Sequence, residues 1–290
     1  MDRASIIQRL GSIQNLPTLP RVVYELDRIV RDPNSNSGDV SKLIQDDPSM
    51  MSRILKVVNS SFYGFPREID NIHQAVVLLG MEAVKNLALT TAVFTTFRKR
   101  GSDGLNRNEF WRHSVSVGIA TRILYEMIEP KLSFREPRES LHLCGLVHDI
   151  GKIVFEQFFH NEFTDAINYA AEQNIPLYQG ERALIGIDHA EVGAWMARKW
   201  NLPAKIEAVA HWHHAPDGAP PEFRPLAHIC HIANYICNQE KLGFSGTLVP
   251  AFEQSFFLSE KGVTIEAILD TVSHIRSEAA ESEVLLALAS

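Results

Sequence analysis

Apolar residues recur at helical spacing through almost the whole chain of 290 residues. After Pro20, for example, they recur three and four residues apart, at Val22, Val23, Leu26, Ile29 and Val30. This period is typical of an amphipathic helix. The same spacing predicts further helices over residues 75–79, 81–97, 109–128, 140–159, 162–173, 188–200, 204–213, 225–238 and 265–275. No segment alternates apolar and polar residues as a half-buried strand does, so the sequence predicts an all-α fold.

A polar, basic stretch divides the chain into parts. Residues 98–107 read RKRGSDGLNR, a composition typical of a linker. We therefore expect an N-terminal helical part over residues 1–98, a second helical part over 106–240 and a C-terminal helical tail over 241–290. Within the tail, we expect the acidic EAAESE to break the helix. The apolar ending LLALAS is a candidate surface for docking or for a homodimer.

The composition excludes several classes of protein. The net charge of −7 leaves no basic stripe of the kind that binds nucleic acid. No apolar run reaches the roughly 18–20 residues of a membrane span, and the N-terminus is too polar for a secretion signal. The three cysteines, an odd number without CxxC spacing, argue against a disulfide framework. We expect a soluble, cytoplasmic protein that binds neither nucleic acid nor a membrane.

Histidine is concentrated in the second part of the chain, where residues 113–231 contain ten of the 12 histidines. The strongest local motif is HDIGK, at residues 148–152. If the helix bends at His148 and Asp149, both side chains reach one divalent ion, and this pair suits Zn, Fe, Mn or Co better than Mg or Ca. Such a pair within an apolar helix is costly to bury without a partner. Lys152 lies one turn after His148, where it can meet an anionic oxygen such as that of phosphate.

Further candidate ligands flank this motif. Glu109 and His113 are four residues apart and share one helix face, while His189 starts a predicted helix and HWHH (211–214) adds more imidazoles. Each has an ordinary alternative: an exposed Glu–His pair, a helix cap, and histidines that complement a helix dipole. Together the candidates provide enough metal-binding side chains for two ions. They are Glu109, His113, His148, Asp149, His189, His213 and His214.

These motifs together resemble a known family. The order of His, His-Asp, Lys, His and His-His resembles the HD phosphohydrolase superfamily, with spacing closest to its HD-GYP branch. The first half resembles the HDOD (HD-related output domain) family of bacterial signalling proteins, in LPTLP (16–20), DDPSMMSRILKVVNSSFYG (46–64) and IHQAVVLLGMEAVKNLAL (72–89). The HDOD resemblance covers residues 10–240. It implies an all-helical fold in which a small N-terminal helical subdomain packs on an HD-like core.

The resemblance also implies roles for particular residues. Lys152 matches a lysine that contacts substrate phosphate in HD-GYP enzymes, which implies catalytic roles for Lys152 and Asp149. The final ligand of the family, an Asp, is replaced here by Asn234, which coordinates through an uncharged carbonyl oxygen. The segment that shapes the cyclic dinucleotide pocket in HD-GYP enzymes is reduced to HHAPDGAPPE (213–222) and has lost GYP. The implied metal ligands are Glu109, His113, His148, Asp149, His189, His213, His214 and Asn234.

Two functions are compatible with these residues. The HDOD pattern, Asn234 and the missing GYP favour a bacterial signalling module that acts through contacts with another signalling protein. Such a module would hold one or two divalent transition metals, with Fe or Mn favoured and Zn, Co or Ni compatible. The retained ligands and Lys152 favour instead an active metal-dependent phosphohydrolase or phosphodiesterase, for example on a cyclic dinucleotide or another phosphate-containing ligand. Because P-loop, GxSxG and Rossmann glycine patterns are absent, kinase, α/β-hydrolase and dehydrogenase functions are not competitive.

Overall fold

The structure, a computed structural model, describes residues 3–60, 63–97, 105–249, 257–282 and 286–287. Regular structure within these residues is helical, and no strand occurs among them, which confirms the predicted all-α fold. Most of the predicted linker at 98–107 and most of the LLALAS ending lie outside the described residues.

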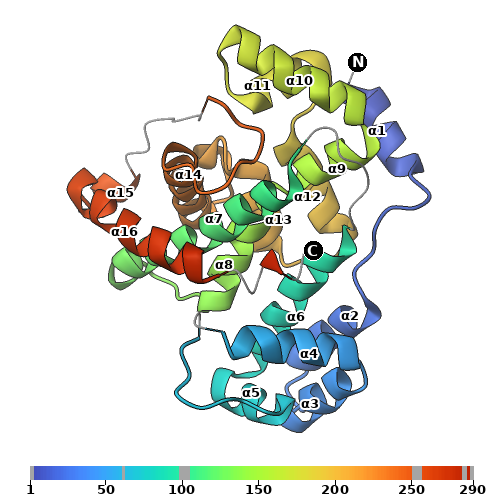
Figure 1. Cartoon of the computed structure of the whole chain (residues 1–290), viewed down its shortest axis with the longest axis vertical. Coiled ribbons are helices and arrows are strands. Elements are labelled where there is room, and N and C mark those ends of the chain that lie inside the picture. Colours follow the sequence, from blue (N-terminus) through green and yellow to red (C-terminus); the bar gives the residue numbers. More distant parts are fainter. Residues whose placement is uncertain (1–2, 61–62, 98–104, 250–256, 283–285, 288–290) are drawn as a thin grey trace.

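An N-terminal bundle forms one end of the molecule (Figure 1). Asn36, Asp47 and Asn71 start three of its helices, because each side chain accepts a hydrogen bond from a backbone N–H of the first turn. Its longest helix, α6, is buried over most of its length, since it packs on α2 and α4 of the bundle and on α8 of the core. The helices of the bundle are α2 (Arg21–Arg31), α3 (Ser37–Gln45), α4 (Pro48–Val58), α5 (Ile72–Leu79) and α6 (Met81–Thr96).

None of the described helices is by itself long and apolar enough to cross a membrane. Helices α5 and α6 reach that length and composition only as a pair, and the pair is bent by 119° at its break.

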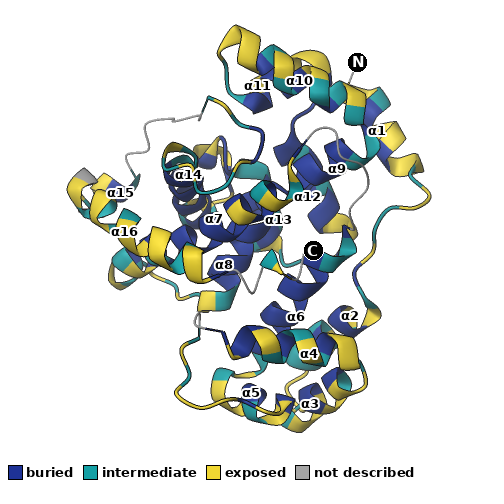
Figure 2. Cartoon of the chain, viewed as in Figure 1, coloured by how far each residue is buried: buried dark blue, intermediate teal, exposed yellow. Residues whose placement is uncertain are grey.

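The second part of the chain forms the core around α7, the longest of the described helices at 22 residues. Helix α7 packs against α8, α14 and α16, so its faces are buried from several directions. Figure 2 shows that buried residues gather where α7, α8, α13 and α14 meet. The core helices are α7 (Arg107–Ile128), α8 (Arg138–Val147), α9 (Ile150–Phe158), α10 (His160–Gln173), α11 (Leu177–Leu184), α12 (His189–Lys199), α13 (Ala204–Trp212) and α14 (Arg224–Gln239).

Both ends of the chain also pack on this core. Helix α1 (Arg3–Ser12) lies beside α9 and α10 rather than in the N-terminal bundle (Figure 1), and Arg3 and Arg9 form ion pairs with carboxylates of the core at 2.9 and 2.8 Å. After the short helix α15 (Phe257–Glu260), helix α16 (Ile265–Glu281) packs on α7. The helix does end within EAAESE (278–283), at Glu281, but it extends six residues beyond the predicted end at residue 275. Alanine and glutamate both have high helix propensity.

The three cysteines, all of them described by the structure, form no disulfide, as their number and spacing in the sequence indicated. All three cysteines carry free thiols and are buried in the core helices α8 and α14. Burial raises the pKa of the Cys144 thiol to about 12, so this thiol stays protonated at neutral pH.

Candidate metal centre

The His–Asp pair lies where the chain passes from α8 to α9. The predicted single helix over 140–159 is in fact two helices, α8 and α9, and the break falls at His148 and Asp149. The break allows α9 to approach α12 closely. At Gly151, an added Cβ would lie 2.0 Å from the carbonyl oxygen of His189, so only glycine fits at this contact. The motif HDIGK thus combines a turn that presents two side chains with a glycine that lets the next helix dock.

Three other parts of the core, namely α7, α12 and the end of α13, bring side chains to this turn. Asp149 belongs to two groups of potential ligand atoms. Within each group, all ligand atoms lie within 4.8 Å of one another, and all of the residues are buried. One group joins Asp149 to His113 of α7 and to His148. The other group joins it to His189, His213 and His214. The structure therefore brings together six of the predicted site residues, and two ions are compatible with two groups that share one carboxylate.

The distances around Asp149 describe the arrangement. Its Oδ1 lies 3.1 Å from Nε2 of His189 and 3.5 Å from Nε2 of His213. Its Oδ2 lies 3.3 Å from Nε2 of His148 and 4.0 Å from Nε2 of His113. The same nitrogen atom of each ring therefore faces the carboxylate.

Hydrogen bonds on the outer side of the rings fix this orientation. In His148 and His213, Nδ1 is hydrogen-bonded to the carbonyl oxygen three residues earlier, at 2.7 and 2.9 Å. In His189, Nδ1 lies 2.6 Å from Oε2 of Glu181. When Nδ1 donates to an outer acceptor, Nε2 is the nitrogen that binds a metal, and such outer partners are a regular feature of metal sites.

The donor atoms fit a divalent transition metal. Among the described residues, Nε2 of His148, Nε2 of His213 and Oδ1 of Asp149 are buried without a hydrogen bond of good geometry. Buried polar atoms without a partner are costly, and a cation would satisfy all three. Tetrahedral ligands at about 2.0–2.1 Å from an ion are about 3.3 Å apart. The separations of 3.1 and 3.5 Å around Oδ1 are close to this value.

Burial keeps three of the histidines neutral. It lowers the pKa of His113 to about 3 and that of His213 to about 4, and it lowers the pKa of His214 well below its usual value. Burial alone would raise the pKa of Asp149, but the surrounding cationic groups hold it well below its usual range. Neutral imidazole and ionised carboxylate are the forms that bind metal.

His189 differs from the other histidines. Burial alone would lower its pKa, but Glu181 and Asp149 outweigh this effect and raise it to about 9. Its Nε2 also lies 2.8 Å from Nε2 of His214, as in an N–H···N hydrogen bond. Metal binding at this imidazole is therefore expected to release a proton.

Lys152 is buried beside the carboxylate. Its ammonium donates to Oδ2 of Asp149 at 2.6 Å and to the hydroxyl groups of Ser245 and Thr247, both at 3.1 Å. Because an ammonium has three donors, all of its protons have partners within the chain. The two hydroxyl groups come from the segment after α14, which folds back so that the N–H of Phe244 donates to the carbonyl oxygen of Glu109.

The two remaining predicted ligands have different positions. Asn234, on α14, has its Oδ1 3.0 Å from Nε2 of His113, so it lies at the edge of the cluster. The Glu109 side chain is 42% exposed, lies 3.6 Å from Arg112 and belongs to neither group of ligand atoms. Its role as a ligand stays a prediction, and in this structure only its backbone carbonyl contributes, by anchoring the returning segment.

Sequence reasoning missed three residues. Glu181, Ser245 and Thr247 contact the cluster, yet none lies in a recognisable motif. Only Glu181 could have been found from the sequence, because it is a carboxylate eight residues before the candidate ligand His189, in a segment with helical periodicity. Asp188 and Glu191 have the sequence spacing of a capping box, of which the structure contains one half. Asp188 accepts from the N–H of Glu191 at 2.9 Å, but the Glu191 carboxylate pairs with Arg3 instead of reaching back.

Comparisons with known proteins agree with this architecture. The HDOD domain family matches residues 16–216. An "Uncharacterized protein" of Treponema pallidum (strain Nichols) is 27% identical over 231 residues, which are 80% of this chain and 43% of that protein. The chain thus spans less than half the length of this curated relative.

Solved structures share the fold. The HDOD domain protein with unknown function from Geobacter sulfurreducens superposes with a TM-score of 0.73 at 24% identity, over 97% of this chain and 95% of that one. For the "Putative phosphohydrolase" from Shewanella amazonensis SB2B, the TM-score is 0.72 at 22% identity, over 97% and 98%. For the "Putative signal transduction protein" from Marinobacter aquaeolei VT8, it is 0.79 at 19% identity, over 99% and 65%.

Fold and site together define an all-helical protein with an HD-type cluster of histidines around one aspartate. The match to the HDOD family covers more than half of the chain. The chain belongs to the HDOD family, and the predicted resemblance is confirmed.

Proposed function

We propose that this chain is a regulatory module of bacterial signalling that acts through contacts with another signalling protein. Its HD-like core would hold one or two divalent transition metals as part of the fold. The observation that supports this proposal best is the closure of the site. His113, His148 and Asp149 are fully buried, and Lys152 is 1% exposed.

The space that the described residues leave beside the cluster is too small for a substrate. The space beside His189, His214 and Asn234 amounts to about 10 Å³, which holds about one water molecule. The protons of Lys152, the residue matched to a phosphate-binding lysine, are all donated within the chain. A buried, closed cluster of this kind suits a metal that stabilises a fold better than a metal that meets a substrate.

A metal-dependent phosphohydrolase is the second candidate, because six of the predicted site residues are together. A bound ion would supply a Lewis acid at this cluster. For a phosphate group to reach it, residues 243–247 would have to leave Lys152. One structural neighbour is named a putative phosphohydrolase and another a putative signal transduction protein. At 22% and 19% identity, these proteins share the fold with this chain without deciding its activity.

The first experiment measures the metal. Elemental analysis of protein purified without chelator should find about one equivalent or more of transition metal, and less than about a tenth would contradict the metal site. The His148→Ala variant should lose the metal. His160→Ala is the matched control, because His160 starts α10 outside both groups of ligand atoms.

The second experiment measures turnover. The metal-loaded protein is incubated with cyclic di-GMP and with bis(p-nitrophenyl) phosphate, with and without Mn²⁺. The regulatory module should turn over neither substrate. The Ser245→Ala/Thr247→Ala double variant, which releases two partners of Lys152, should not turn them over either. Turnover that is absent in His148→Ala would establish the phosphohydrolase instead, whether it occurs in the wild type or only in the double variant.

A further inference from the structure

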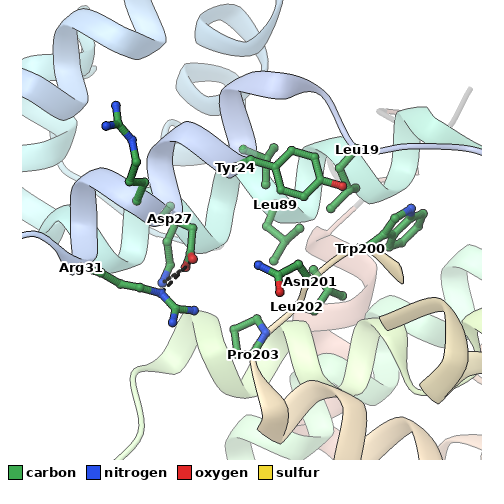
Figure 3. A pocket seen from close by; sticks show the side chains of 12 residues that line it. Leu19, Tyr24, Asp27, Arg31, Leu89, Trp200, Asn201, Leu202 and Pro203 are labelled. Carbon is green, nitrogen blue, oxygen red and sulfur yellow. Dashed lines mark hydrogen bonds and ion pairs between the residues drawn. The ribbon is translucent and has the colours of Figure 1, made fainter. Parts of the chain in front are cut away.

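A second cleft lies between the N-terminal bundle and the core. This cleft, of about 310 Å³, is bounded by α2 and α6 of the N-terminal bundle and by the turn that joins α12 to α13 (Figure 3). None of its lining residues belongs to the two groups of ligand atoms around Asp149. Its volume is at the lower end of the range for small-molecule sites.

Most of the wall is apolar. Leu19, Val23 and Leu89 line the side of the N-terminal bundle, and Trp200, Leu202 and Pro203 line the side of the core. Tyr24 also lines the cleft (Figure 3), and this residue is 37% exposed. A flat or chain-like apolar body would therefore contact both halves at once.

The wall on the core side is held in place before any ligand arrives. The indole N–H of Trp200 donates to the carbonyl oxygen of Pro17 at 2.8 Å. Asn201 has a φ of +52°, in the left-handed region that asparagine tolerates. The N–H of Leu202 then donates to the carbonyl oxygen of Ala197 at 2.9 Å, which fixes the end of α12 as in a Schellman motif.

One end of the cleft is charged. Arg28, Arg31, Lys85 and Asp27 line it. Asp27 lies 2.8 Å from Nε of Arg31 and 3.5 Å from the ammonium of Lys85, which also pairs with Glu82 at 2.8 Å. Arg28, Arg31 and Lys85 outnumber the carboxylates of Asp27 and Glu82 by one, so one positive charge remains in excess. The closest contact of Asp27 is with Nε of Arg31, and because a guanidinium has five N–H donors, Arg31 keeps donors for a ligand.

We infer that this cleft binds a small organic anion with an aromatic or aliphatic body. The body would lie against the apolar walls and the anionic group would meet the guanidinium of Arg31. A ligand there would join the N-terminal bundle to the core, which suits the input of a regulatory module. The inference goes beyond the proposed function, because the cleft needs neither a metal nor a signalling partner to bind.

The test uses two probes that share their rings. The anion 8-anilinonaphthalene-1-sulfonate and the uncharged N-phenyl-1-naphthylamine both fluoresce in apolar sites, and only the first carries a sulfonate. Each probe is titrated into the full chain and into Arg31→Glu. The matched control is Arg21→Glu, which makes the same charge change on the same helix, also beside a paired carboxylate at i±4, but outside the cleft.

The anion should bind saturably. Arg31→Glu should weaken its affinity about tenfold, as expected for the loss of a charge-assisted hydrogen bond, and should leave the uncharged probe within about twofold of wild type. Arg21→Glu should change neither. Tyr24→Ala, at an exposed position that tolerates substitution, should weaken both probes by about threefold or more through lost ring contact.

Three results would overturn the inference: no saturable binding, equal effects of Arg31→Glu and Arg21→Glu on the anion, or an equal effect of Arg31→Glu on both probes. The protein is tested both with and without chelator treatment. Binding that is the same in the two preparations keeps this result separate from the outcome of the metal analysis.

Discussion

Replacing Gly151 by alanine tests the contact on which the metal centre depends. Gly151 lies near the start of α9, directly against α12, and a Cβ there would lie 2.0 Å from the carbonyl oxygen of His189 and 2.8 Å from the backbone nitrogen of Gly193. Both atoms belong to the backbone of a helix, so no side chain can rotate away. Helix α12 would have to move by about 1 Å or more to restore ordinary contact distances.

The size of the effect follows from two opposing contributions. Overpacking a core site costs about 1–3 kcal/mol, and backbone contacts are at the upper end of that range. The gain in helix propensity from glycine to alanine offsets about 0.5–1 kcal/mol. We expect a net loss of about 2 kcal/mol in the free energy of unfolding. Because metal–ligand distances tolerate only about 0.2 Å, the displaced His189 should also lower metal affinity at least about tenfold.

Urea unfolding and competition with a chelator measure the two effects. Gly193→Ala is the matched control on the facing helix. Its added Cβ would meet its nearest neighbours at 3.5 and 3.6 Å, which are ordinary contacts. This variant should therefore be as stable as the wild type, or more stable by up to about 1 kcal/mol.

The reasoning is refuted if Gly151→Ala keeps both wild-type stability and wild-type metal affinity. It is also refuted if Gly193→Ala is destabilised as strongly, because the effect would then not depend on the close approach. Loss of stability with unchanged metal affinity would show that the ligands are held independently of the docking of α9 on α12.

Other substitutions test the surroundings of the cluster. Burial lowers the pKa of His142 from 6.5 to about 4. The unfolded chain therefore takes up a proton first as pH falls, and stability is lost between these values. From pH 7.5 to 5.0, urea unfolding of the wild type should show about 2 kcal/mol of loss that His142→Gln lacks, and equal losses would contradict the assignment. Asn234→Asp should tighten divalent metal binding about tenfold in a chelator competition, since it adds a charge beside His113, and unchanged affinity would place residue 234 outside the ligand set. Glu181→Gln should weaken metal binding about 10–100-fold with helix content unchanged, whereas wild-type affinity would show that Glu181 does not orient His189.

Local signals in the sequence were sufficient for most of the helices, though not for α1 and α11, and for most of the cluster. The periodicity over 109–128 and 204–213 matches α7 and α13 to within two residues. His148 and Asp149 were informative because they follow the mostly apolar run of residues 141–147, and His113 because it lies within the periodic segment 109–128. Such signals depend only on residues close together in the chain, so one sequence is enough to detect them.

The remaining contacts depend on tertiary packing. Ser245 and Thr247 are more than 90 residues from Lys152, and nothing in their own segment marks them as its partners. The role of Gly151 was also not predictable, because the glycine is required by the close approach of α12, which lies about 40 residues further along the chain. Glu109 shares a helix face with His113, yet its side chain turns to Arg112, since helix spacing alone does not fix where a long side chain ends.

The segment that covers Lys152 has a consequence for kinetics. An ion held among ligands that solvent does not reach can leave only when part of the fold opens. Its residence time would then follow the rate of that opening rather than the strength of its coordination. The bound ion would then be the one that was available when the chain folded. Two preparations made in different media could therefore differ in metal content while remaining identical in sequence and in fold.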